Sequence, residues 1–514
     1  MEKLESYAIK KVAKGGVIIF AAIILSSLAF LFYRIIAARY LGPSDYGMLT
    51  LGIVILKITT IFGLLGIHMS IGKFINHYLA KKQYGRAKGL LISSFSVTIS
   101  FSFLLLLLLY TFSGFMEQNV FRIEGISAVI KIFSFAIPFS VLTQLFYYYF
   151  FAFKKPGYVI ISESIFEKLA NLLFLLLVIF ISASVYFLSL GYIISLVISS
   201  IAGIILFKSN ILAIFKKGIK PLFELKQLIS FSFPLMIAGV LGAALAWTDT
   251  IFIGIYGSSS DVGIYNAAYL IASSLMIIWL SFGEVFYPII SELYAKRAKT
   301  SISRIFEVSS RWIFILVLPI FVFILVFPTR AISLVFGNGF LEANLPLLIL
   351  IVGYFFITIS GLTDQGLRTF KKTRFIGVST FISFLMNILL NFLLVPPYGM
   401  VGAAIATSIT IITFSIIRIV VFKKILSFNY ELNLYFRYIF LAIISFFLVF
   451  SIFKLLNLFS TFFFIIAIML YLMSYFALII FSKSFSKEDI MVLQALERKL
   501  GISIPFLKLL LNNN

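Results

Sequence analysis

Residues 40–47 read YLGPSDYG, and residues 256–263 read YGSSSDVG. At a constant offset of 216 residues, the two stretches share a tyrosine, a serine, an aspartate and a glycine. The matched pairs are Tyr40 and Tyr256, Ser44 and Ser260, Asp45 and Asp261, and Gly47 and Gly263. Apolar matches arise by chance in an apolar chain, so the polar and glycine matches are the informative ones. They predict an internal duplication.

Long apolar runs surround both stretches. The 514 residues are 62% hydrophobic and 12% charged, whereas a soluble domain is about half apolar and about a quarter charged. Much of the surface must therefore face lipid. A membrane-spanning helix needs about 20 apolar residues. Runs of about this length lie at 15–39, 46–70, 88–112, 127–151, 159–181, 185–207, 229–255, 262–288, 305–327, 342–363, 374–395, 400–422, 434–455 and 459–482.

The duplication covers six of these runs, an even number, so both copies share one orientation in the membrane. Repeats of this kind are related by an axis along the membrane normal. We therefore expect an all-α polytopic membrane protein of about fourteen helices, with two pseudo-symmetric six-helix lobes around a central cavity. The expected segments are a cytoplasmic N-terminus (1–14), an N-lobe (15–207), a cytoplasmic linker (208–228), a C-lobe (229–422), two further helices (434–482) and a cytoplasmic amphipathic tail (483–514).

The basic residues orient the helices. Most of the 42 Lys and Arg residues lie in alternate loops, for example at Lys81 and Lys82, whereas the other loops hold single residues such as Arg122 and Lys454. Cytoplasmic loops carry an excess of Lys and Arg. This pattern predicts a multi-pass protein of the plasma membrane with both termini in the cytoplasm.

Several kinds of function are excluded by composition and motifs. The chain has no cysteine and two histidines, His68 and His77, which fit no metal-binding pattern. The net charge of +23 is divided among short loops, which does not indicate nucleic acid. No nucleotide-binding loop precedes a helix, and no long outer loop is available for an active site. We expect neither an enzyme nor a bound metal or cofactor, with coupling to Na⁺ or H⁺ left open.

The duplicated stretches also resemble a known family. RIIAARYLGPSDYG at 34–47 is similar to the first-helix signature of polysaccharide and O-antigen flippases, and WTDTIFIGIYGSSSDVGIY at 247–265 resembles their seventh-helix pattern. These flippases belong to the multidrug/oligosaccharidyl-lipid/polysaccharide (MOP) exporter superfamily. The resemblance implies that this chain moves a polyprenyl- or dolichyl-(pyro)phosphate-linked oligosaccharide from the inner to the outer leaflet by alternating access. Such a flippase serves the biosynthesis of surface polysaccharide or glycoprotein glycans.

Two cations within the spans are candidates for the substrate site. Lys57 lies about 16 Å into its helix at 1.5 Å per residue, near the midplane. Arg34 lies nearer the outer end of its helix and could instead extend its charge outward. Charged groups at this depth are costly and mark functional sites. The resemblance implies a cationic cavity for an anionic lipid phosphate, so Arg34 and Lys57 are the proposed phosphate-facing residues. A structural ion pair is the alternative for Lys57.

Four acids are candidates for a gate or for ion coupling. They are Asp249, Glu163, Glu167 and Glu284. Asp249 lies one residue from the repeat mate of Arg34, which suggests an outer gate closed by an ion pair; ion coupling and simple packing are the alternatives. Farther along the chain, Asp364 and Arg368 have the spacing of a local ion pair. Asn387 and Asn391 share one helix face and are expected to make interhelical hydrogen bonds.

Two other functions compete with the flippase. A multidrug or organic-cation exporter of the same superfamily should show an acidic cavity in its first lobe and about twelve helices. Here the first helix carries Arg34 and no acid, and two further helices follow the repeat. A membrane glycan polymerase or glycosyltransferase should carry long outer loops. The expected partners are the lipid-linked glycan, membrane lipids, and glycosyltransferases or a polymerase of the same pathway. We expect a monomer that does not bind nucleic acid.

Overall fold

The computed structural model describes residues 2–155, 157–181, 184–212, 218–428, 431–455 and 461–482. Within these ranges the chain is helical, with no β-strand. Side chains before residue 28 and the side chain of Glu163 lie outside the description, as do the predicted tail at 483–514 and part of the linker at 213–217. Eleven described segments are long and apolar enough to cross a membrane. The prediction of a helical multi-pass membrane protein is confirmed.

The helices divide between two compact units. Unit 1 comprises residues 1–267, 336–342 and 384–403, and unit 2 comprises 268–335, 343–383 and 404–514. Unit 1 contains α1 (Glu2–Gly63), α2 (Ile67–Ala80), α3 (Tyr84–Phe115), the π-helix η1 (Met116–Phe121), α4 (Ile126–Ala152), α5 (Gly157–Val159), the π-helix η2 (Ile160–Leu169), α6 (Ala170–Ile181), α7 (Val185–Asn210) and α8 (Leu225–Tyr256).

Unit 2 contains most of the remaining helices. They are α10 (Met276–Ala295), α11 (Lys299–Val326), α12 (Pro328–Val335), α13 (Asn344–Ser360), α14 (Leu362–Thr369), α16 (Leu432–Leu455) and α17 (Thr461–Phe481). Three elements contribute residues to both units: α9 (Ser259–Ser273), the 3₁₀ helix η4 (Asn338–Ala343) and α15 (Thr373–Leu426).

Helices α1 and α15 each consist of two helices that meet at a kink, and the kink lies at a glycine. Gly42 in α1 has φ 75°, and Gly399 in α15 has φ 53°, a left-handed conformation that glycine adopts without a steric penalty. Pro43 follows the first bend, and Pro396 and Pro397 precede the second, so backbone donors are missing where each helix turns. The segments 28–80 and 373–426, of 53 and 54 residues, are too long to cross a core of about 30 Å only once. The count of fourteen helices remains a prediction.

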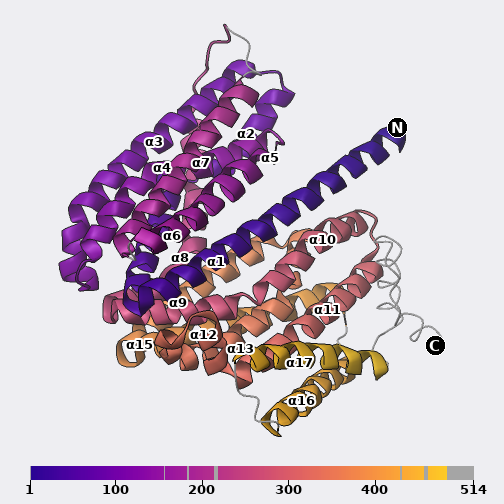
Figure 1. Ribbon diagram of the computed structural model, residues 1–514. Coiled ribbons are helices and arrows are strands. Elements are labelled where there is room, and N and C mark those ends of the chain that lie inside the picture. Colours follow the sequence, from indigo (N-terminus) through magenta and orange to yellow (C-terminus); the bar gives the residue numbers. More distant parts are fainter. Residues whose placement is uncertain are drawn as a thin grey trace. The chain divides into compact units, whose positions relative to one another are not determined.

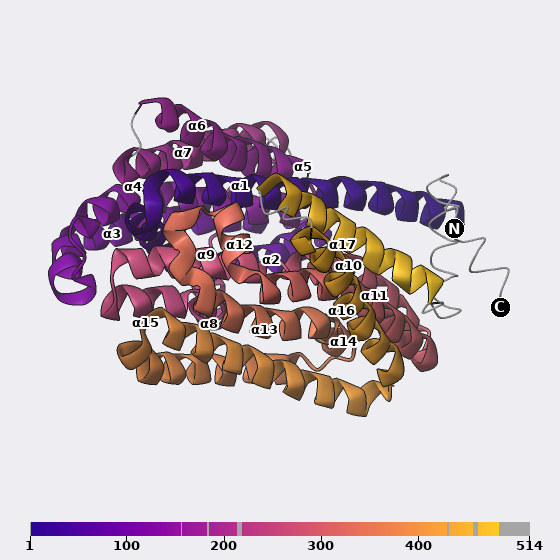
Figure 2. The ribbon, with the colours of Figure 1, turned by 60° about the horizontal axis from the view of Figure 1, so that its bottom comes forward.

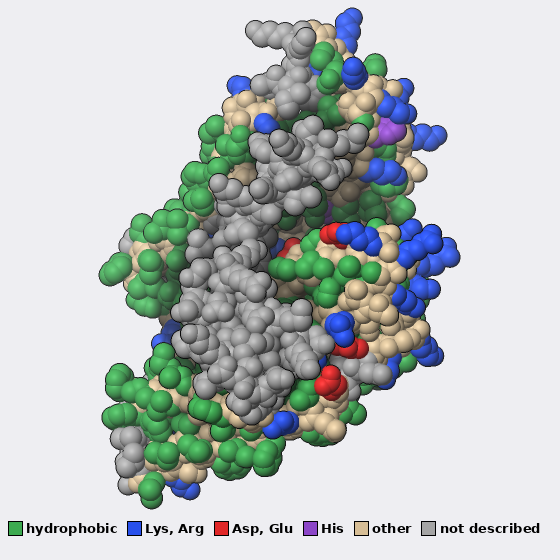
Figure 3. Space-filling view, turned by 90° about the vertical axis from the view of Figure 1, so that its right-hand side faces the viewer, with side chains coloured by type: hydrophobic (Ala, Val, Ile, Leu, Met, Phe, Trp, Pro, Cys, Tyr) green, Lys and Arg blue, Asp and Glu red, His purple; other side chains and the backbone are tan. Residues whose placement is uncertain are grey.

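Each unit has its own core. In unit 1, α4 packs between α3 and α7 (Figure 1), and its buried side chains include Phe133, Phe146 and Tyr149. In unit 2, α16 and α17 run side by side (Figure 2) and pack on α11 through Phe314, Tyr438 and the residues around them. On the face drawn in Figure 3, Lys and Arg gather along the right-hand edge, while apolar side chains cover much of the other described surface. This distribution suits a lipid-facing protein with basic loops.

Candidate functional site

The two copies of the duplicated stretch touch each other within unit 1. A Cβ placed on Gly47 would lie 1.7 Å from the carbonyl oxygen of Ser259, and one placed on Gly263 would lie 2.1 Å from that of Pro43. Pro43 and Ser259 are themselves separated by the repeat offset, so the contact is reciprocal. The hydroxyls of Ser44 and Ser259 are 2.8 Å apart. Only glycine allows the backbones of α1 and α9 to approach this closely.

Arg34 precedes Pro43 and Gly47 on α1, and its side chain is buried. Its side chain is 4% exposed, donates a hydrogen bond of 3.3 Å to Thr50, and lies over the ring of Tyr46 at 5.5 Å. Tyr33 and Tyr192 belong to the same cluster, since Tyr33 interacts electrostatically with Arg34, Tyr46 and Tyr192. Among the described residues, the hydroxyls of Tyr33 and Tyr192 have no hydrogen-bond partner.

The Arg34 cluster is therefore rich in donors. Within the described part of the chain, the side chain of Arg34 makes one hydrogen bond to a hydroxyl and no ion pair. A guanidinium group has five N–H donors arranged to match phosphate or carboxylate oxygens. Because buried cations normally require an anionic partner, this cluster is chemically suited to receive an anion.

Lys57 lies near an acidic group. Glu167, 2% exposed, pairs with Lys168 at 2.6 Å, and the charge of Lys57 also acts on the Glu167 carboxylate. The side chain of Lys57 is half-buried, and that of Lys168 also lies 5.3 Å from the ring of Phe30. Two cations therefore share one carboxylate, which leaves the group with a net positive charge. The ion pairing considered for Lys57 has support in this arrangement, whereas the lining of a cavity by Lys57 stays a prediction.

The segment that carries Glu167 is a π-helix, η2, which sequence periodicity did not reveal. π-helical turns occur frequently at functional sites. One turn later, Asn171 is buried, and neither its amide nitrogen nor its oxygen has a hydrogen-bond partner among the described residues. Polar side chains in this condition are uncommon in folded proteins, so a polar group of a ligand or a water molecule would be stabilised there.

Asp249 is the centre of a second buried polar group in unit 1. Its carboxylate, in a residue 6% exposed, accepts hydrogen bonds from Tyr265 and, at 2.9 Å, from the amide of Asn391. A bond of 3.2 Å joins Asn266 to Thr250 on the same helices, α9 and α8. The interhelical hydrogen bond expected of Asn391 is thus confirmed, and its partner is the candidate acid itself.

Other predicted residues lie elsewhere. Glu284 is on α10 of unit 2, with an exposed side chain. The charge of Arg368 acts on the carboxyl of Asp364, as their spacing suggested, but the ion pair at 2.8 Å joins Asp364 to Arg418, which also donates to Thr380. Arg418 comes from α15, 54 residues away, so helical spacing could not have identified it.

The N-terminal end of α8 holds an ion pair that the sequence did not reveal. Glu224 pairs with Arg86 at 3.0 Å and accepts a hydrogen bond from Tyr78. Farther along α8, the hydroxyl of Ser232 lies 2.8 Å from that of Ser70. Within unit 1, the N-terminal part of α8 therefore contacts helices of the first repeat.

Comparisons with known proteins agree with this fold. A family model described as polysaccharide biosynthesis protein matches residues 12–294, and a second, MatE, matches residues 234–393. Among curated proteins, the chain is 26% identical to the "Probable low-salt glycan biosynthesis flippase Agl15" of Haloferax volcanii over 192 residues, which cover 37% of this chain and 41% of that protein. It is 23% identical to the "Putative O-antigen transporter" of Shigella flexneri over 76% of this chain and 91% of that one.

Solved structures show the same fold. The lipid II flippase MurJ in an inward closed conformation superimposes with a TM-score of 0.72, at 17% identity, over 90% of this chain and 97% of MurJ. An inward-facing multidrug resistance MATE transporter gives 0.62, at 11% identity, over 78% of this chain and 94% of that one. Because the first family model matches more than half of the chain, this protein belongs to the polysaccharide biosynthesis protein family of the MOP exporter superfamily.

Proposed function

We propose that the protein is a flippase that carries a lipid-linked oligosaccharide from the inner to the outer leaflet by alternating access. The observation that best supports this proposal is the buried, donor-rich cluster around Arg34. A polyprenyl or dolichyl (pyro)phosphate presents the anionic oxygens that such a cluster lacks among its described residues. The names of Agl15 and of the O-antigen transporter point to the same class of cargo.

In this proposal Arg34 and Lys57 hold the phosphate in turn. Arg34 offers a planar fork, and Lys57 offers a point charge whose strength is moderated by Glu167. A carrier must bind its cargo without retaining it. The sharing of Glu167 between Lys57 and Lys168 limits how tightly the phosphate is held at that point, which favours release.

Alternating access requires the outer junction to open and close. The proposal assigns this role to the reciprocal contact of Gly47 and Gly263, which closes the outer side when the backbones meet. Asp249, held by Tyr265 and Asn391, is the proposed coupling group for Na⁺ or H⁺. Its carboxylate and the amide oxygen of Asn391 are ligand types that hard cations prefer.

The remaining expectations form part of the same proposal. The protein works as a monomer in the plasma membrane, with both termini in the cytoplasm and about fourteen helices in two lobes. It receives its cargo from glycosyltransferases of the pathway and delivers it to a polymerase or transferase outside. It performs no covalent chemistry.

Deletion and complementation test the function. Loss of the gene should trap lipid-linked oligosaccharide on the inner leaflet and remove surface glycan. Re-expression of the wild-type chain or of Arg39→Ala, in which an exposed arginine of the same helix is removed, should restore export. Arg34→Ala should not, and Arg34→Lys should restore it only partly because the fork is lost. Full export by Arg34→Ala would contradict the assignment of the site.

The MatE match makes a drug exporter the second candidate. The same deletion strain separates the two functions. Normal surface glycan combined with new sensitivity to cationic drugs would favour the exporter, and Asp249 would then become the leading substrate contact because a buried carboxylate suits a cationic cargo.

A further inference from the structure

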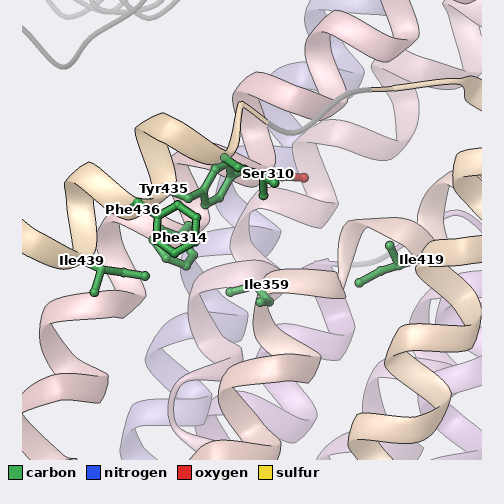
Figure 4. Close-up of a pocket in the computed structure, with 8 residues that line it drawn as sticks. Ser310, Phe314, Ile359, Ile419, Tyr435, Phe436 and Ile439 are labelled. Atoms are coloured by element: carbon green, nitrogen blue, oxygen red, sulfur yellow. The ribbon is translucent and has the colours of Figure 1, made fainter.

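Unit 2 contains an apolar cavity of about 290 Å³. Helices α11, α13, α15 and α16 form its walls (Figure 4). Its lining residues are Ser310, Phe314, Ile359, Ile419, Leu432, Tyr435, Phe436 and Ile439. Leu432 and Phe436 remain 62% and 66% exposed, so the cavity opens toward the surrounding lipid. Inside a bilayer, an apolar opening of this kind is filled by hydrocarbon.

A polar cavity of about 660 Å³ is formed by two of the same helices. Its lining residues come from the first turns of α11 and the end of α15: Lys299, Thr300, Ser301, Ser303, Arg304, Ile305, Glu307, Leu426 and Ser427. Hydroxyl groups and two cations thus surround it, with a single acid. The last turn of α15 adds the exposed Lys423 and Lys424 next to Leu426.

The two cavities are lined by successive stretches of α11 and α15, and the surface that joins them is called the groove below. On α11, Ser303 and Glu307 line the polar cavity, and Ser310 and Phe314 line the apolar one. Their spacing of four, three and four residues places all of them on one helix face. On α15, Ile419 and Leu426 are likewise seven residues apart. Seven residues of helix rise about 10 Å, so the polar and apolar cavities are separated by about this distance along the helices. This separation is comparable with the distance between the phosphate of a lipid and the upper part of its acyl chain.

The polar cavity also lies where a lipid headgroup would be. It surrounds the first turns of α11, just outside the apolar run predicted to begin at residue 305. The cap residue of this helix, Ala298, supplies no side-chain hydrogen bond to the backbone N–H groups of the first turn. These donors, together with Lys299 and Arg304, favour an anionic group.

We propose that this groove binds an anionic glycerophospholipid from the leaflet on the side of the basic loops. Its phosphate lies among Lys299, Arg304 and the hydroxyls of Thr300 and Ser301, and one acyl chain fills the apolar cavity beside Phe314. Charge argues for this occupant over the chain's own tail, because residues 483–514 are basic and would be repelled by the same cations. The site is separate from the cluster at Arg34 and binds a resident lipid rather than the cargo.

Lipid retention by the purified full-length protein tests the proposal. Native mass spectrometry would compare phosphatidylglycerol with phosphatidylcholine of identical acyl chains, added in equal amounts. The wild-type protein should retain phosphatidylglycerol preferentially. The double variant Lys299→Gln/Arg304→Gln should lower that retention roughly tenfold, since each cation near a lipid surface contributes substantially to binding. Ile419→Trp, which fills the apolar cavity, should lower it as well.

The matched control is Lys371→Gln/Lys372→Gln, which removes two exposed lysines from another basic turn of unit 2. This variant should retain phosphatidylglycerol as the wild type does. Equal retention in both double variants, or equal retention of the two lipids by the wild type, would overturn the proposal. So would a disulfide between Ser303→Cys and Leu493→Cys, which would place the tail in the groove; the absence of native cysteines makes that bond easy to detect.

Discussion

Replacing Gly47 by alanine should force α1 and α9 apart at the junction of the two duplicated stretches. The added Cβ would lie 1.7 Å from the carbonyl oxygen of Ser259, whereas ordinary contact begins at 3.4 Å. The backbones of α1 and α9 must therefore separate by about 1.7 Å, and by about 1.3 Å for Gly263→Ala. Both atoms involved are fixed by the backbone, so no side-chain rotation relieves the clash. Overpacking of this kind costs about 1–3 kcal/mol, a shift of about 5- to 150-fold between the closed and the separated state.

A cross-link reports this shift directly. The hydroxyls of Ser44 and Ser259 lie 2.8 Å apart, and the chain has no native cysteine, so Ser44→Cys/Ser259→Cys should form a disulfide under mild oxidation. Adding Gly47→Ala should slow its formation at least fivefold. Gly72→Ala provides the control, because a Cβ at that glycine would have no atom within 4 Å. Equal cross-linking rates in the two backgrounds would refute the inference that these glycines set the closed junction.

Three further predictions concern polar contacts. Asp364→Asn should destabilise the protein by about 1–3 kcal/mol because Arg418, which is largely buried, loses its charged partner; thermal unfolding in detergent measures this change, and an unaltered Tm would contradict it. Glu224→Gln should cost less than about 1 kcal/mol in the same assay because its ion pair is more exposed. Tyr265→Phe removes a hydrogen bond from Asp249 and should shift the dependence of transport on Na⁺ or pH; an unchanged dependence on both would count against coupling at this acid.

The apolar runs predicted the helices because each membrane-spanning helix satisfies its backbone hydrogen bonds within one continuous apolar segment of the sequence. The sequence indicated two separate runs, 15–39 and 46–70, and the backbone leaves the helical conformation between them, at Gly42. The π-helix at Ile160–Leu169 was missed altogether, since hydrophobic periodicity is dominated by the α-helical repeat.

The candidate site could be predicted only as single residues. An ionisable group in an apolar run, such as Arg34 or Asp249, is visible in the sequence as a candidate. Its partners are not visible in this way, because they come from distant helices: Tyr192 joins the Arg34 cluster from α7, and Asn391 reaches Asp249 from α15. Burial decides which of these partners matters, and burial is a property of the packed chain.

The reciprocal glycine contact also bears on the ancestry of the chain. In a symmetric homodimer, a residue i that touches residue j of the partner is matched by a residue j that touches residue i. Gly47 contacts Ser259, and Gly263 contacts Pro43. Gly263 is the repeat mate of Gly47, and Ser259 is the repeat mate of Pro43, so the two contacts are equivalent in the way that this rule requires. An unfused protein carrying one copy of the stretch would thus have made the same contact with a second copy of itself. Gene fusion would have preserved an existing dimer interface. After fusion, replacing either glycine would separate the two copies of the stretch, because each glycine contacts the backbone of the other copy.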